Sequence, residues 1–337
     1  MKKICIPVMG SLLLCFVLSA QETSWSSLRP DGHAPIQVMG DHMHTQGECM
    51  FSYRFMTMNM KGMLSESSEI QNATVFENYM AAPQQMTMNM HMLGFMYAPS
   101  DKLTLMVMGN YISNSMDLQT KMNVDFETSS KGFGDISVAG LLHLLSQKRQ
   151  KVHANVGISI PTGSLDQRGD TPMMNNVRLA YPMQLGSGTW DPYFGATYLG
   201  QSDKTSWGFQ SLYKFRLGEN SEGYTLGNQW SAVGWYAFPA TKSFSFSGSL
   251  DYFKIGSIDG KDAELNPMMM PLFNANNSGR NQLNLGLGSN YLISDGVFKN
   301  LRLALEVTIP LSQSVEGIQM KNGLMSTFGV QYALGHH

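Results

Sequence analysis

The chain has 337 residues, 27 of them methionine and 33 glycine, and only 14% are charged, with a formal net charge of −2. A nucleic-acid-binding protein would carry a basic patch or stripe, which this composition does not favour. After the N-terminal residues, no uninterrupted apolar run reaches the roughly 18 residues of a transmembrane helix, which argues against a helical membrane protein.

Residues 1–20 have the pattern of an export signal. Two lysines near the start are followed by a mostly apolar stretch, and Ser19-Ala20 offers a small-residue cleavage site. The alternative is a lipoprotein signal anchored through Cys15, but the large Leu14 stands where a small residue is usual. Cleavage after residue 20 would leave Cys49 as the only cysteine, so the mature chain would have no internal disulfide.

Residues 21–46 form a separate segment, which we expect to lie in the periplasm or to plug the membrane domain that follows. The segment concentrates possible metal ligands, namely His33, Met39, Asp41, His42, Met43 and His44. In an extended chain the H-x-H pair places two imidazoles on one side, and copper or zinc ligation is chemically possible. The alternative is that these histidines form hydrogen bonds inside a plug.

From residue 47 to residue 337 the sequence alternates between apolar and polar residues, in segments of about ten to sixteen residues separated by turn-forming clusters. Lys151–Ile160 and Leu301–Ile309 show this period clearly. Strands of a soluble sandwich average about five or six residues, whereas about 9–11 are needed to cross a membrane at a tilt. The pattern therefore predicts an all-β protein, a transmembrane antiparallel β-barrel.

The spacing of turns predicts twelve strands, with both chain ends in the periplasm, because short and long connections must alternate. This number requires Gln184–Leu199 to be one strand, and fourteen strands are the alternative. The longer, outward connections are expected at about 61–85, 117–130, 162–181, 218–225, 256–280 and 311–322.

Methionine recurs at every second position in three successive predicted strands. In the first strand, the face that carries the methionines also carries Ser52 and Arg54, which do not belong in lipid, so this face should line the lumen. The residues expected to line the lumen are Arg54, Met56, Met58, Met60, Met86, Met88, Met90, Met92, Met96, Met106 and Met108.

Three roles are open for these methionines. They can simply fill irregular apolar gaps, because the side chain is flexible. They can form an apolar lining for a solute that crosses the barrel. They can also form a thioether surface for Cu(I) or Ag(I), since soft sulfur ligands select such ions.

Several segments resemble a known group of proteins. The stretch Ala34–His44, followed by Gly47-Glu48 and Ser52–Met56, resembles the start of uncharacterised outer-membrane transporters near the family of the MetA pathway of phenol degradation, distantly akin to the long-chain fatty-acid channels. Weaker matches are Phe133-Gly134-Asp135, Pro161–Ser164, Gln184–Thr189 and Leu265-Asn266-Pro267. The resemblance implies a twelve-stranded barrel that moves apolar small molecules.

We therefore expect a bacterial outer-membrane channel that allows facilitated diffusion of a small apolar molecule, has outer-membrane lipid around it, and uses no cofactor. The alternative is a protein that binds or transports a soft metal ion, copper or silver, through its Met and His clusters. An enzyme is not favoured, because His91 and His143 have no serine partner at a convincing spacing and the chain contains no G-x-S-x-G motif.

Overall fold

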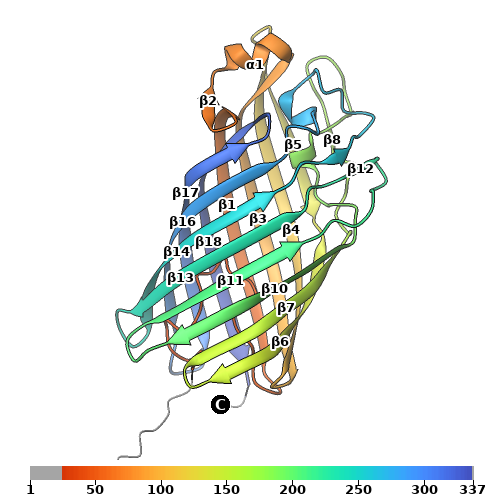
Figure 1. Ribbon diagram of the computed structural model, residues 1–337. Helices are drawn as coiled ribbons and strands as arrows, with labels where there is room; N and C mark the ends of the chain where they lie inside the picture. Colours follow the sequence, from red (N-terminus) through yellow and green to blue (C-terminus); the bar gives the residue numbers. More distant parts are fainter. Residues whose placement is uncertain (1–24, 336–337) are drawn as a thin grey trace, which may run out of the picture.

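The structure, a computed structural model, describes residues 25–335 (Figure 1). The predicted export signal at residues 1–20 lies outside this range. Within residues 25–335, no helix is both long and apolar enough to span a membrane.

Twelve antiparallel strands form a closed barrel, as the sequence predicts, because each strand pairs with the next and the last strand pairs with the first. The strands are β1 (Cys49–Ser65), β3 (Ala81–Ser100), β4 (Leu103–Thr120), β6 (Ile136–Gln147), β7 (Gln150–Ile160), β10 (Asp191–Gln201), β11 (Ser206–Lys214), β13 (Gln229–Pro239), β14 (Phe244–Ile255), β16 (Arg280–Leu292), β17 (Leu301–Val315) and β18 (Ile318–Leu334).

The two ends of the barrel differ. The lower end in Figure 1 carries both ends of the described residues 25–335 and the short turns, such as the one between β6 and β7. Short turns are periplasmic in outer-membrane barrels, which makes the upper end extracellular. The small elements of the connections are β2 (Ser68–Ile70), α1 (Asn72–Asn78), β5 (Asp125–Phe133), β8 (Arg168–Gly169), β9 (Val177–Arg178), η1 (Tyr181–Met183), β12 (Tyr224–Thr225), β15 (Asp259–Gly260) and η2 (Pro271–Phe273).

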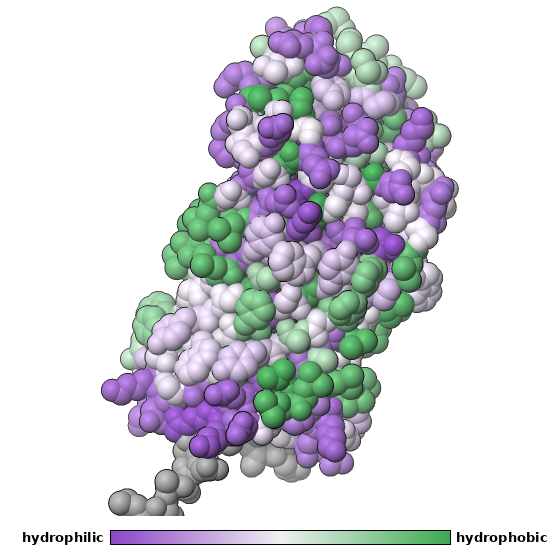
Figure 2. All heavy atoms as spheres, in the orientation of Figure 1, coloured by the Kyte–Doolittle hydropathy of each residue, from purple (hydrophilic) through white to green (hydrophobic). Residues whose placement is uncertain are grey.

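Large apolar side chains cover the outside of the barrel. Leu93 is 67% exposed and Leu287 is 55% exposed, and they belong to a set that includes Phe51, Phe95, Leu105, Phe194, Phe209, Tyr236, Leu250 and Phe328. Figure 2 shows hydrophobic and pale residues over the middle of the barrel and hydrophilic ones gathered at its lower rim and over its upper extension. An apolar band on a closed barrel is a lipid-facing surface.

Three predicted boundaries are wrong. Gln184–Leu199 is not one strand, because β10 begins at Asp191 and the residues before it fold into the preceding connection. Residues 311–322 are not a long loop, because β17 and β18 continue to a tight turn at Glu316-Gly317. Residues 117–130 form the tip of a β4–β5 hairpin. In each case the strand boundary depends on strand pairing or side-chain hydrogen bonds outside the membrane. The alternation of apolar residues does not predict these interactions.

The wall is interrupted between β5 and β6. β4 pairs with β6 along its lower part and with β5 along its upper part, and Gly134-Asp135 separates the two partners. The carboxylate of Asp135 accepts hydrogen bonds from the backbone N–H of Gly163 (2.9 Å) and from the N–H and hydroxyl of Ser187 (2.9 and 2.8 Å). A Cβ on Gly163 would lie 2.6 Å from the Cα of Gly186, so glycine is needed at this crossing. Three motifs far apart in sequence thus join at the break.

Residues 25–48 lie inside the lower half of the barrel and form a plug. The plug has little regular secondary structure, so its backbone carbonyls need donors from the wall. Arg54 Nε donates to the Ile36 carbonyl (3.0 Å), Arg302 Nη2 donates to that of Ala34 (2.6 Å), and Gln210 Nε2 donates to that of Met39 (2.9 Å). The polar lumen-facing side chains of the wall therefore hold the plug in place.

Candidate functional site: a methionine-lined chamber above a histidine-bearing plug

A cavity of about 660 Å³ lies inside the barrel. The plug lies next to it, because Thr308 lines the cavity and accepts a hydrogen bond from the side chain of Gln37. Part of its wall is thioether, from Met58, Met60, Met86, Met88, Met320 and Met325. Another part is polar, from Gln229, Asp251, Arg280, Gln282, Asn284 and Asn322. We call this cavity the inner chamber; it offers both apolar and hydrogen-bonding surface to an occupant.

The methionine rows of adjacent strands face one another. Met56, Met58 and Met60 of β1 lie directly opposite Met90, Met88 and Met86 of β3. The row continues sideways, because Met58 also lies opposite Met325 of β18, and Met86 lies opposite Met116 of β4. Directly opposed side chains on one face of a sheet touch, so the thioethers form a continuous lining.

The residues that the sequence predicts for the lumen are all buried or half-buried in the structure. Arg54, Met60, Met86, Met96 and Met106 are buried, and Met56, Met58, Met88, Met90, Met92 and Met108 are half-buried. They do not all line the inner chamber. Arg54 anchors the plug, and Met96 and Met106 pack with Met43 of the plug in a lower methionine cluster.

A second cavity, of about 280 Å³, lies among the extracellular connections; we call it the outer pocket. It is lined mainly by apolar residues that include Met80, Met116, Met122, Phe126, Met173, Met183, Met269, Met270 and Phe273. None of these residues is among those that the sequence predicts to line the lumen. The run Met268-Met269-Met270 is the one signal in the sequence that points to this place.

One buried cluster separates the two cavities. Met60, Met86 and Met320 belong to it and line the inner chamber, while Met116, Met183 and Met270 belong to it and line the outer pocket. We call this cluster the methionine partition. Methionine has three rotatable bonds and no branch, so such a partition can rearrange around a passing molecule with little cost.

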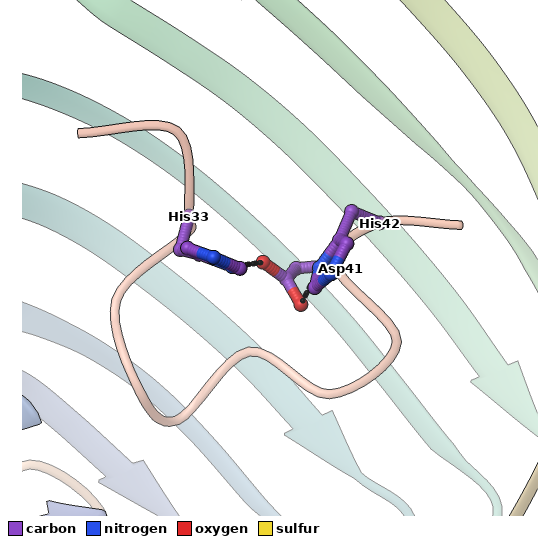
Figure 3. Close-up of side chains that lie close together, drawn as sticks. All are labelled: His33, Asp41 and His42. Carbon is purple, nitrogen blue, oxygen red and sulfur yellow. Dashed lines mark hydrogen bonds and ion pairs between the residues drawn. The ribbon is translucent and has the colours of Figure 1, made fainter. Parts of the chain in front are cut away.

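The plug carries a buried group of histidines around one carboxylate, shown in Figure 3. His42 Nδ1 lies 2.9 Å from Asp41 Oδ1, and His33 Nδ1 lies 3.6 Å from Asp41 Oδ2. The ring centroids of His33 and His42 are 4.6 Å apart, and those of His42 and His44 are 4.8 Å apart. The plug thus brings together three of the predicted metal ligands, and Asp41 with them. Met43 instead packs in the lower methionine cluster.

Burial keeps the imidazoles of His33 and His44 neutral. It lowers the pKa of His33 to about 3, with a further contribution from the positive charge of Arg302. Burial also lowers the pKa of His44, partly offset by the side chain of Glu48. A neutral imidazole keeps a free lone pair, so at neutral pH these groups can accept a hydrogen bond or ligate a metal ion.

The extracellular connections are tied together by a cluster of charges that the sequence does not reveal. The buried guanidinium of Arg178 lies 2.6 Å from Glu222, 2.9 Å from Glu264 and 3.5 Å from Asp262. Glu222 comes from one connection, and Asp262 and Glu264 come from another, so no local motif records the cluster. It fixes the loop that carries Met173 and Met183 against the loops of β12 and β15.

Comparison with known proteins identifies the family. Residues 77–328 match the family described as "Putative MetA-pathway of phenol degradation". The chain belongs to this family. The resemblance that the sequence motifs suggest is thereby confirmed. No curated protein matches the chain.

Solved structures share the barrel of this phenol-degradation family member. The COG4313 outer-membrane channel from Pseudomonas putida F1 is 14% identical, with a TM-score of 0.59 over 87% of this chain and 98% of that one. The transport unit of the autotransporter AIDA-I from Escherichia coli is 10% identical, with a TM-score of 0.50 over 88% and 93%. A FadL homologue from Pseudomonas aeruginosa is 8% identical, with a TM-score of 0.43 over 90% and 98%. The fold is that of a bacterial outer-membrane protein, as expected.

Proposed function

We propose that this protein is an outer-membrane channel for the facilitated diffusion of a small, largely apolar molecule that carries a polar group. The inner chamber carries the proposal, because a thioether wall and an amide- and charge-bearing wall enclose one space inside the barrel. Ligand sites of several hundred cubic ångströms are typically apolar with a few polar groups that fix orientation. The family description, which names phenol degradation, agrees with such a solute.

The proposed route begins at the outer pocket. An apolar molecule binds there, passes the methionine partition and enters the inner chamber. The partition excludes ions and sugars, because these would have to shed water against thioether surface without new hydrogen bonds. The plug occupies the lower half of the barrel, so release to the periplasm requires the plug to shift.

Liposome uptake tests the proposal. Purified protein in liposomes should admit phenol-like solutes faster than sugars of similar size. Replacing Met58, Met88 and Met325 together by serine removes thioether surface from the chamber and should slow phenol uptake about tenfold, which corresponds to about 1.4 kcal/mol of lost apolar contact. The matched control replaces Met174 and Met268, which are 65% and 62% exposed and line neither cavity, by serine. Equal uptake by the two variants would show that the chamber is not the route.

Soft-metal transport is a second candidate, favoured by the opposed methionine pairs of β1 and β3. Thioether sulfur prefers Cu(I) and Ag(I) over harder ions. Titration of the folded barrel with Ag(I) tests it, beside a variant with Met88, Met90 and Met92 changed to serine. Tight Ag(I) binding that the variant loses would favour this function over solute diffusion, and absence of binding would reject it.

A further inference from the structure

The histidine group in the plug has features that solute diffusion does not require. His33, Asp41 and His42 each present one ligating atom, and these atoms all lie within 4.8 Å of one another. All three side chains are buried. A carboxylate between two imidazoles is a donor set for a transition-metal ion.

Two nitrogens of the group lack a hydrogen-bond partner among the described residues. They are His33 Nδ1 and His44 Nε2, and both side chains are at least nine-tenths buried. The 3.6 Å between His33 Nδ1 and Asp41 Oδ2 is too long for a good hydrogen bond. Buried polar atoms are usually paired, so unpaired ones call for a ligand or an explanation.

Space for an occupant adjoins these side chains. A small cavity of about 30 Å³ is lined by His33, His42 and His44, together with Met50. A water-sized occupant needs only about 10–15 Å³ measured in this way, so an ion with one water fits. Leu28, which is 50% exposed, also lines the cavity and places it near the periplasmic mouth.

We infer that His33, Asp41 and His42 form a binding site for one divalent transition-metal ion, with His44 as a further ligand. Ligands at about 2.0–2.1 Å from a tetrahedral ion lie about 3.4 Å apart. His42 Nδ1 lies 2.9 Å from Asp41 Oδ1 and His33 Nδ1 lies 3.6 Å from Asp41 Oδ2, on either side of this value, so small side-chain rotations that bring one carboxylate oxygen toward both rings complete the site. Imidazole and carboxylate donors favour Cu²⁺ most strongly and then Zn²⁺.

Nearby charges set the strength of the site. Arg302 lies beside the group and donates to the carbonyl of Ala34, the residue after His33, so its positive charge opposes a cation. The carboxylate of Asp41 supplies the compensating negative charge within the site. A bound ion joins the two ends of the loop from His33 to His42, and this would stiffen the plug.

Copper titration of the folded, full mature chain, prepared without an added histidine tag, tests the inference. Cu²⁺ is added in competition with a chromophoric chelator, and electron paramagnetic resonance counts the bound nitrogens. We expect one tight site with couplings from at least two imidazoles. His33→Gln and His42→Gln should each weaken it at least tenfold, since loss of a mere supporting residue already costs about 10–100-fold. The matched control is His91→Gln, which changes an exposed histidine of β3 and should leave the affinity unchanged.

A measurement on the unaltered chain covers the case in which these variants do not fold. Hydrogen exchange of residues 33–44 should slow when Cu²⁺ or Zn²⁺ is added, because the ion ties the loop together. Unchanged exchange at a saturating concentration of both ions would overturn the inference. Equal Cu²⁺ affinity of the unaltered chain and the His42→Gln variant would overturn it as well.

Discussion

The two halves of the barrel interior are built from the same strands but filled in opposite ways. β1 carries Arg54 in the lower half and Met58 in the upper half, and β18 carries Gln331 in the lower half and Met320 in the upper half. The lower half contains a plug without regular structure, whose carbonyls must be hydrogen-bonded. In residues 25–335 the plug does not reach the upper half, where thioethers form part of the wall of a cavity. The interior residue type therefore follows from what occupies the space, and not from the strand itself.

The largest effect on stability should come from removing a side chain that holds the plug in the lower half of the barrel. Arg302 donates to Asn290, Gln331 and the carbonyl of Ala34, and its side chain is almost fully buried. Changing Arg302 to alanine leaves these acceptors unpaired and should destabilise the plug by about 3 kcal/mol. Hydrogen exchange in residues 30–42 should accelerate, and ion conductance in planar bilayers should rise.

Lys321→Gln provides the comparison for that change. Lys321 forms an exposed ion pair with Glu69 in the extracellular half, and such pairs contribute about 0–1 kcal/mol. Exchange in the plug should not respond to this substitution. A plug equally protected in the Arg302 and Lys321 variants would mean that the wall does not hold the plug through its carbonyls.

A smaller effect should come from the wall break where the two halves meet. A Cβ on Gly163 would meet the backbone of Gly186, and backbone cannot move aside as a flexible side chain does. Gly163→Ala should therefore cost about 1–3 kcal/mol in thermal or denaturant unfolding. Gly248→Ala is the matched control, because nothing lies within 4 Å of the added carbon. Equal unfolding free energies of the two variants would show that the backbone at Gly163 and Gly186 can move apart to accept the added carbon.

The smallest effect on stability, but a clear one on transport, should come from stiffening the upper half. Replacing Met86 and Met116 by leucine roughly conserves volume, so stability should change by less than about 1.5 kcal/mol. Leucine is branched and less adaptable than methionine, so the partition should open less readily. Phenol uptake into liposomes should slow while the melting temperature stays nearly constant. Unchanged uptake would show that solutes do not pass between these residues.

Much of the barrel follows from the sequence. The alternation of apolar and polar residues predicts the strands, because a period of two is a local property of extended chain. The alternation of short and long connections predicts that there are twelve of them. Strand ends are less well predicted: Gln184–Ser187 has the composition of a strand but instead turns to bond with Asp135. That bond joins residues 52 positions apart, and nothing in the local pattern records it.

The sequence by itself determined a membrane-spanning barrel with an inward methionine row and a histidine-rich segment before it, since each is a pattern of neighbouring residues. Only the tertiary structure decided which other residues the methionine row and the histidine-rich segment contact. Closure of the barrel brings Met183 and Met270 from separate loops onto Met86 and Met116, which makes the partition. The wall donors fold the plug back on itself, so His33 meets Asp41 and His42. Such contacts depend on the path of the whole chain through three dimensions, which local periodicity does not encode.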